Sequence, residues 1–181
     1  GDDYSSQFTI GALPLGTVTV SIEDFARGPQ QPVNIPANGT SGLPISFSNG
    51  GSITSANFTL RYNPALLNIT GATVAPGLTG ASVNINTSTP GIAVIQFSSP
   101  TPLAAGTTRF IDLAAAVPTT APYRTKQVLD FTNVSFNTGL IPAVDDDALH
   151  IAAYFGDTTG NGLYSATDAS RISRVAVGFD T

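Results

Sequence analysis

The sequence predicts an all-β protein, folded as a β-sandwich with a short loop and one helix at its C-terminal end. Three observations carry this prediction. Apolar and polar residues alternate with a period of two through most of the chain, turn signals such as "SNGG" (48–51) and "STPG" (88–91) separate the alternating runs, and helical periodicity begins only at residue 167. About eight or nine strands fit between these turns.

The first predicted strand covers residues 17–22, where Val18 and Val20 alternate with threonine. The following "FARGPQQP" (25–32) has the composition of a linker. The strand therefore either belongs to the sandwich or ends a preceding module, so 1–29 is treated as a separate N-terminal segment.

The next strands follow the same period. They are expected at 43–47, 56–62, 82–86, 91–99, 109–117 and 126–136. The run at 91–99 is apolar on both faces at its centre, which predicts a middle strand covered on two sides. Between two of the strands, "YNPALLNIT" (62–70) contains Pro64, which suits a first helical position, so one helical turn is expected there.

The strand at 126–136 is expected to contain a β-bulge. Its apolar residues change from odd positions, such as Phe131, to even positions, such as Phe136. The register must therefore slip by one residue, and the bulge is predicted near Thr132 and Asn133.

The last strand is predicted at 148–155. Its apolar side is formed by Leu149, Ile151, Ala153 and Phe155. His150 falls on the other side and has no Cys, Ser or second His at a spacing that suits catalysis or zinc. It is therefore expected to be a residue of the strand surface.

Composition limits the classes of partner. Charged residues make up 10% of the 181 residues, whereas Gly (18) and Pro (13) are abundant, as in an extracellular β module. A net charge of −5 with seven basic residues argues against nucleic acid, because phosphate neutralisation needs clustered Lys and Arg. The absence of Cys excludes disulfides and thiolate chemistry.

No membrane span is expected, since no apolar run approaches the ~20 residues that cross a bilayer. No basic-then-apolar leader precedes Gly1. The chain is therefore expected to be a piece of a larger, multimodular protein.

The segment "GDTTGNGLYSATDASRISRVAVG" (156–178) carries a different pattern. Counted from Asp157 as position one, oxygen-bearing residues fall at positions one, three, five, nine and twelve, with Gly162 at six and a backbone carbonyl at seven. The ligands in this order are Asp157, Thr159, Asn161, Leu163 (through its carbonyl), Ser165 and Asp168. This spacing predicts a twelve-residue Ca²⁺ loop, in which Gly at six permits the sharp turn. Thr at three and Asn at five bind more weakly than Asp, so the affinity should be moderate.

A second cation site is a weaker candidate. "VDDDALH" (144–150) holds three adjacent carboxylates, Asp145, Asp146 and Asp147, which repel one another unless a cation or Arg lies near. The simpler interpretation is a solvated turn before the last strand.

The Ca²⁺ loop leads into a predicted helix. Ser165 or Thr167 can cap its N-terminus, and Gly178 is placed to end it. Its apolar stripe consists of Ala169, Ile172, Val175 and Ala176, and Arg171 and Arg174 lie together on another face.

Residues 156–178 resemble one repeat of a bacterial dockerin, the duplicated calcium loop-helix module that binds cohesins. A dockerin has two such repeats, and this chain contains one. The resemblance implies that Ala166, Thr167, Arg171 and Arg174 recognise a partner. The helix would also present Ile172 and Val175 to a partner or to the sandwich.

Two other segments, "ANFTLRYNPALLNITGATVAPGL" (56–78) and "TRFIDLAAAVP" (108–118), resemble a cohesin domain. That family is a nine-stranded jelly-roll sandwich, of immunoglobulin-like form, in which a strand ending in Tyr-Asp/Asn-Pro precedes a short Leu-bearing turn. The expected organisation is a cohesin-like sandwich over 30–153 and a single dockerin-like repeat over 154–181.

The resemblance implies a non-catalytic, calcium-binding module for protein–protein assembly or adhesion in a secreted or cell-surface bacterial protein. The partner is expected to be a protein of the cohesin or dockerin type, or a neighbouring module of the same protein. No pair of carboxylates is placed for glycoside hydrolysis, so no active site is expected.

Two alternatives remain open. One is a carbohydrate-binding module of an extracellular polysaccharide-degrading enzyme, with calcium as a structural ion. The chain has no Trp, so its candidate sugar platforms are Tyr4, Tyr123 and Tyr164. The other is a purely structural stalk repeat.

Overall fold

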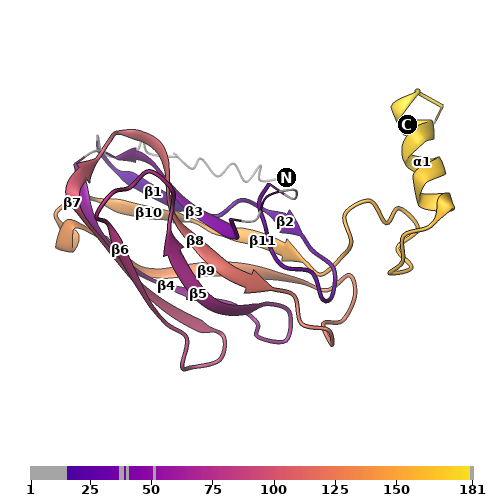
Figure 1. The fold of residues 1–181 in the computed structure, drawn as a ribbon, viewed down its shortest axis with the longest axis horizontal. Coiled ribbons are helices and arrows are strands. Elements are labelled where there is room, and N and C mark those ends of the chain that lie inside the picture. Colours follow the sequence, from indigo (N-terminus) through magenta and orange to yellow (C-terminus); the bar gives the residue numbers. More distant parts are fainter. Residues whose placement is uncertain (1–15, 37–38, 40, 51, 180–181) are drawn as a thin grey trace, which may run out of the picture.

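The computed structural model describes residues 16–36, 39, 41–50 and 52–179, and Tyr4 lies outside them. Two β-sheets pack face to face, and the C-terminal loop and helix extend from one end of the sandwich (Figure 1). The predicted all-β sandwich with a C-terminal helix is confirmed.

The strands divide into a five-stranded and a six-stranded sheet. The first sheet contains β1 (Val18–Ser21), β3 (Leu43–Gly50), β5 (Asn68–Val74), β8 (Gly106–Ala116) and β10 (Ala143–Asp146). The second contains β2 (Phe25–Ala26), β4 (Ile53–Arg61), β6 (Ser82–Asn86), β7 (Ile92–Leu103), β9 (Lys126–Phe136) and β11 (Ala148–Ile151). Their orders are β10-β1-β3-β8-β5 and β2-β11-β9-β4-β7-β6. A 3₁₀ turn, η1 (Asn137–Gly139), follows β9, and α1 (Ala166–Ala176) follows β11.

The first two and the last two strands pass from one sheet to the other side by side. β1 lies between β10 and β3, and the chain then enters the other sheet as β2; β10 and β11 make the same crossing. β1 runs parallel to β10, with Val18 opposite Ala143, and β2 runs parallel to β11, with Phe25 opposite His150. The strand predicted at 17–22 is therefore a strand of this sandwich.

A cluster of phenylalanine rings forms the centre of the core. The fully buried ring of Phe110 lies 5.2 to 6.5 Å, between centroids, from the rings of Phe47, Phe58, Phe97 and Phe136. Most of these pairs meet edge to face, the arrangement that aromatic quadrupoles favour. Because Phe47 and Phe110 come from one sheet and the others from the second sheet, the cluster joins the two sheets.

The bulge predicted in β9 is confirmed. Asn57 of β4 pairs with Ser135 and Thr59 pairs with Thr132, so β9 carries one extra residue between these pairs. Asn133 lies in this interval with φ 55°, a left-handed conformation that Asn tolerates better than most residues.

Several details of the predicted strands differ from the structure. β2, β5 and β10 were not predicted, and β2 lies in the segment that was expected to be a linker. Before β5 the chain makes a hydrogen-bonded turn at Asn63, whose carbonyl accepts from the N–H of Leu67. β7 is covered on one face and not on two: Val94 is 41% exposed, whereas Ala93 and Ile95 on either side of it are buried. Central position within a sheet thus does not imply a covering layer on both faces.

The phase predicted for the last strand is wrong. Ala148 and His150 of β11 point into the core, Leu149 is 36% exposed, and the strand ends at Ile151. The ring of His150 is fully buried and stacks on Phe25 with centroids 4.6 Å apart. An imidazole suits this position because one flat face packs like an aromatic ring while Nδ1 accepts a hydrogen bond from Gln127 Nε2 (2.9 Å).

The buried histidine predicts loss of stability in acid. Burial lowers the pKa of His150 from 6.5 to about 4, so the folded protein holds the ring neutral. Because the folded pKa lies below the unfolded one, this stability is fully present above pH 6.5 and is lost as the pH falls through 4. The loss should reach about 3 kcal/mol at most. In thermal scans across this interval, His150→Leu should show a flatter pH dependence than the unaltered chain. Identical slopes would contradict the assignment.

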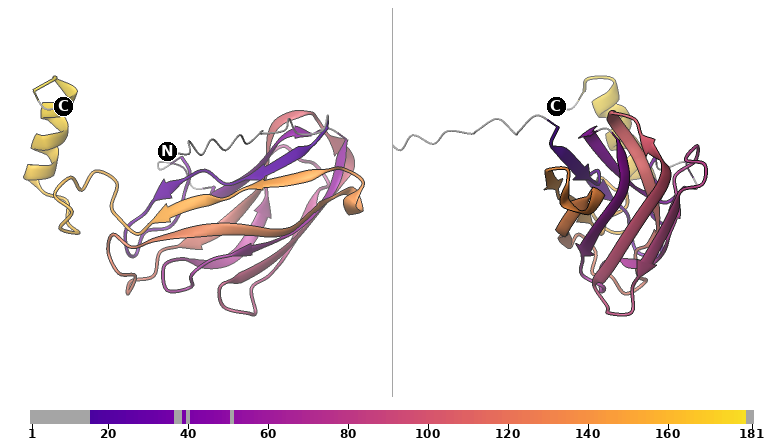
Figure 2. Two further views of the ribbon diagram at one scale, coloured as in Figure 1. Left: turned by 180° about the vertical axis from the view of Figure 1, so that it is seen from behind. Right: turned by 90° about the vertical axis from the view of Figure 1, so that its left-hand side faces the viewer.

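The C-terminal segment extends beyond one end of the sandwich. Two views agree that the loop after β11 and α1 lie beyond one end of the sheets (Figures 1 and 2). As predicted, Gly178 ends the helix: its φ is 76°, and Phe179 N–H then donates to the Arg174 carbonyl. In the part of the chain that the structure describes, no helix has both the length and the apolar character to cross a membrane.

Candidate functional site

The carboxylate of Asp157 is the centre of the C-terminal loop. Its Oδ1 accepts hydrogen bonds from the backbone N–H of Gly160 (2.7 Å) and Asn161 (3.3 Å) and from the hydroxyl of Thr159 (3.0 Å). Its Oδ2 accepts from Gly162 N–H (2.7 Å) and from the hydroxyl of Tyr123 (2.5 Å). These donors, of which Tyr123 has the largest effect, lower the pKa of Asp157 and keep it ionised.

Asp168 is the second carboxylate of the loop and also opens α1. Its Oδ1 accepts from Thr159 N–H (2.9 Å) and from the Thr158 hydroxyl (3.2 Å). Its Oδ2 accepts from the N–H (2.8 Å) and the hydroxyl (2.6 Å) of Ser165, which is the N-cap. Asp168 and Ser165 thus form a reciprocal capping box. The Ser165 hydroxyl, above all, holds the pKa of Asp168 well below its usual range.

The structure brings both carboxylates to the same residue. Thr159 donates its hydroxyl to Asp157 and its backbone N–H to Asp168. Gly160 and Gly162 have φ of 70° and 79°, conformations that let successive N–H groups turn toward Asp157. The oxygen-rich donor set of this closed loop fits a hard cation such as Ca²⁺.

The other predicted ligands lie on the outer part of the loop. Asn161 is exposed, and its Oδ1 accepts from Leu163 N–H (2.9 Å), which folds this part into a tight turn. Leu163 is 68% exposed.

The carboxylates at 145–147 lie at the end of β10 and directly after it. Within the described residues, no three acidic, His or Cys side chains converge to hold a metal ion. Asp145 and Asp146 belong to β10, and Asp147 Oδ1 accepts from Phe131 N–H (2.9 Å). The three aspartates are exposed, as the simpler interpretation expected, but two of them belong to a strand and not to a turn.

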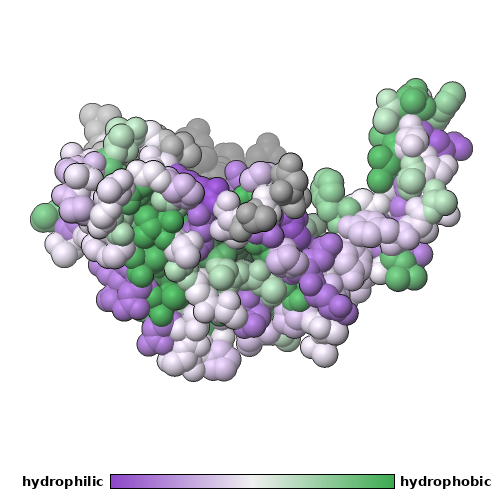
Figure 3. Space-filling view, viewed as in Figure 1, coloured by the Kyte–Doolittle hydropathy of each residue, from purple (hydrophilic) through white to green (hydrophobic). Residues whose placement is uncertain are grey.

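The predicted partner-binding residues lie on the helix that follows. Ala166 and Thr167 occupy its exposed first turn, and Arg171 Nη1 donates to the Thr158 carbonyl (3.0 Å). Ile172 and Val175 are 48% and 59% exposed. Arg174, also exposed, is in the last turn. Figure 3 shows apolar side chains gathered along α1 and the segment after it.

The proposed sugar platforms are engaged within the chain. Tyr123 and Tyr164 flank Tyr154, with ring centroids 5.7 and 5.5 Å from it. The hydroxyl of Tyr123 is committed to Asp157 and that of Tyr164 donates to the Phe155 carbonyl (3.2 Å). The carbohydrate-binding alternative therefore gains no support from these residues.

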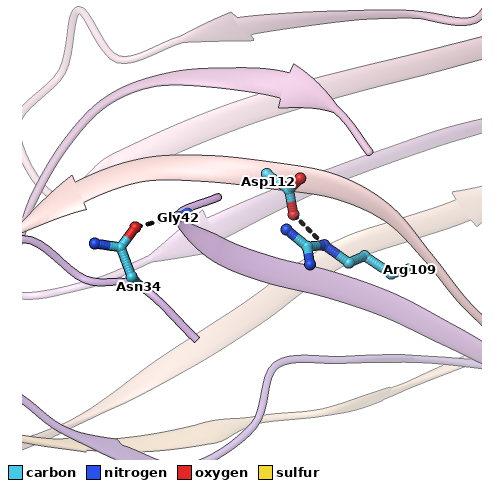
Figure 4. Close-up of polar contacts among 4 residues, drawn as sticks. All are labelled: Asn34, Gly42, Arg109 and Asp112. Atoms are coloured by element: carbon cyan, nitrogen blue, oxygen red, sulfur yellow. Dashed lines mark hydrogen bonds and ion pairs between the residues drawn. The ribbon is translucent and has the colours of Figure 1, made fainter. Parts of the chain in front are cut away.

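A hollow of about 470 Å³ lies beside β5 and β8 on the five-stranded sheet. Among its described lining residues, Asp112 is the one ionisable group, and Arg109 Nε pairs with its Oδ1 at 2.5 Å (Figure 4). Nearby, Gly42 N–H donates to Asn34 Oδ1 (3.0 Å). The Arg109–Asp112 pair stays within β8, and the described lining holds no second carboxylate or base for acid–base chemistry.

The fold is a two-sheet β-sandwich in which β1 pairs with β10 and β2 with β11, both in parallel. The chain belongs to the cohesin domain family, whose model matches residues 33–153. Cohesin domains are protein–protein interaction modules and not enzymes.

Solved structures show the same fold at low sequence identity. CaCohA2 from Clostridium acetobutylicum has 16% identity and a TM-score of 0.62, covering 79% of this chain and 94% of that one. A non-cellulosomal cohesin from the archaeon Archaeoglobus fulgidus has 10% identity and a TM-score of 0.61, covering 82% and 99%. The Coh-OlpC–Doc435 complex, a type I cohesin–dockerin complex from Clostridium thermocellum, contains a chain with 14% identity and a TM-score of 0.60. The match covers 79% of this chain and 97% of that one. A search of curated protein sequences finds no match.

Sequence reasoning missed the role of two residues at the loop. Tyr123 donates to Asp157 from 34 positions earlier in the chain, and Thr158 donates to Asp168 from within the loop. The twelve-residue spacing assigns no ligand to position two and says nothing about distant residues. No local sequence signal marks Tyr123 for this role.

Proposed function

We propose that this chain is a calcium-dependent assembly module of a secreted or cell-surface protein. Its cohesin sandwich binds a protein partner, and its dockerin-like loop and helix bind one Ca²⁺. The observation that carries the calcium assignment is the closed hydrogen-bond ring of the loop: Asp157 collects the N–H groups of Gly160 and Gly162, while Asp168 collects that of Thr159.

Six residues would hold the ion: Asp157, Thr159, Asn161, Leu163 through its carbonyl, Ser165 and Asp168. A bound Ca²⁺ supplies a positive charge that draws carboxylate, hydroxyl and carbonyl oxygens together. The chain's own part is to keep Asp157 and Asp168 ionised and to place Asp168 in the first turn of α1. An 11-residue helix is too short to persist alone in water, so its order depends on this loop.

The partner of the sandwich is proposed to be a dockerin-type protein. Family membership supports this, as does the similarity in fold to a cohesin that was solved with its dockerin. The exposed face of α1 is proposed as a second contact surface. Thr158, Arg171, Ile172, Val175 and Ala176 line an open, mostly apolar groove of about 610 Å³ there. Apolar surface of this kind on a helix marks interaction sites.

Calcium titration tests the proposal. Calorimetry should show one site with a Kd between about 0.1 μM and 1 mM, the range of sensor and extracellular calcium sites. Chelation should lower helical circular dichroism and leave the β-sheet signal in place, because the ion acts on the loop and helix. In a second arm, immobilised dockerin and cohesin modules are exposed to the calcium-loaded and the chelated chain. The absence of both binding heat and any spectral change on chelation would remove the calcium function; the second arm tests the partner separately.

A further inference from the structure

The Ca²⁺ loop is in contact with the sandwich through the connection between β8 and β9. The hydroxyl of Tyr123 donates to Asp157 Oδ2 (2.5 Å) and accepts from Tyr154 N–H (3.2 Å). The Tyr123 ring faces Gly162, where an added Cβ would lie 3.8 Å from it. Asp157, at position one of the loop, is thus hydrogen-bonded to the sandwich, and Gly162, at position six, packs on it.

Arg124 makes the neighbouring contact. A Cβ on Gly160 would lie 3.1 Å from Arg124 Nη1, so the guanidinium lies close over position four. The backbone of Arg124 has φ 63°, in the left-handed region, and its N–H donates to the Ala152 carbonyl (2.9 Å). A strained conformation held by a backbone hydrogen bond shows that the surrounding structure sets the position of this connection.

The segment that leads into the loop is anchored to the sandwich as well. The Tyr154 ring lies so close to Gly28 that a Cβ there would come within 2.1 Å of it. Its hydroxyl donates to the Pro29 carbonyl (3.0 Å). Tyr154 therefore cannot move away without breaking its fit to the sandwich, and Asp157 follows three residues later.

We propose that Tyr123 is a positioning residue of the Ca²⁺ loop: a side chain of the cohesin sandwich orients the first carboxylate ligand, and the sandwich thereby takes part in calcium binding. This inference rests on the proposed calcium function. Groups that hydrogen-bond a metal ligand fix its orientation, and their removal costs about 10- to 100-fold in metal affinity. The loop and the cohesin sandwich consequently bind calcium as one unit.

The test compares Tyr123→Phe with Tyr154→Phe in the full chain. Each variant removes one hydroxyl from a group of neighbouring tyrosine rings. The Tyr154 hydroxyl bonds the Pro29 carbonyl and does not reach the loop, and Tyr154→Phe keeps the ring that fits against Gly28. By calorimetry, Tyr123→Phe should weaken Ca²⁺ binding about 10-fold or more. Tyr154→Phe should stay within about twofold of the unaltered chain.

A second readout separates positioning from a general loss of structure. With chelator present, Tyr123→Phe should lower the thermal midpoint of the helix signal. It should add no further loss to Asp157→Ala, since alanine has no oxygen that can accept from Tyr123. Calcium binding by the unaltered chain together with unchanged affinity in Tyr123→Phe would overturn this inference alone. Additive losses in the double variant would also overturn it. An unaltered chain that binds no calcium would overturn both this inference and the proposed function.

Discussion

Replacing Asp157 with asparagine is expected to abolish calcium binding, with the affinity falling by more than about 100-fold. The carboxylate is one of the two in the loop and accepts hydrogen bonds from Tyr123, Thr159 and three backbone N–H groups. An asparagine side chain has nearly the same size but carries no charge, and its Nδ2 cannot accept. The substitution thus removes half of the loop's anionic charge. The Nδ2 group of the asparagine also faces at least one of the N–H or O–H groups that donate to the carboxylate.

The same variant should lose helix order even where calcium is abundant. α1 begins at Ala166, directly behind the loop, and its capping carboxylate Asp168 is held by Thr159, which also contacts Asp157. Calorimetry and far-ultraviolet circular dichroism measure both effects.

Asp146→Asn is the matched control. Asp146 is exposed at the end of β10 and its replacement removes the same charge from the chain. This control should bind calcium with the affinity of the unaltered chain. Equal losses in the two variants would show that net charge, and not the loop, controls binding.

The largest effect on stability is expected for Phe110→Ala, which should lower the free energy of unfolding by about 3–5 kcal/mol. Phe110 is fully buried and its ring contacts rings from both sheets, including Phe47 and Phe58. Truncation removes the transfer free energy of the ring and leaves a cavity where the sheets meet. The free energy of unfolding of a domain is only about 5–15 kcal/mol in total, so about a fifth or more of the stability should be lost.

Denaturant titration followed by the β-sheet signal measures this effect. Phe155→Ala is the control, because Phe155 is 81% exposed and its truncation should change the free energy of unfolding by no more than about 0.5 kcal/mol. A loss below about 1 kcal/mol for Phe110→Ala would mean that the sheets close over the gap, and that the phenylalanine cluster does not hold them together.

The strands and the bulge could be predicted because their signals are local. Period-two alternation places one face of each strand in the core, and the shift from Phe131 to Phe136 requires an extra residue wherever that strand lies. The loop and its helix were predicted for the same reason. Ligand spacing, the capping Ser165 and the terminal Gly178 all lie within one short segment.

Predictions failed where burial depends on a strand's neighbours. His150 carries a polar side chain, and its own strand puts larger apolar residues on either side of it, so alternation placed it outside. The parallel pairing of β11 with β2 sets Phe25 opposite it and turns that face inward. β10 was missed because three aspartates resemble a turn until β1 is placed beside them.

The amino-acid sequence by itself determined the sandwich, the oxygen spacing of the loop and the helix behind it, because each depends on residues a few positions apart. Only the tertiary structure decided that the sandwich reaches the loop through Tyr123, 34 residues before Asp157. A hydrogen bond over that separation depends on how the β8–β9 connection and the end of β11 come together, and no local pattern encodes that meeting.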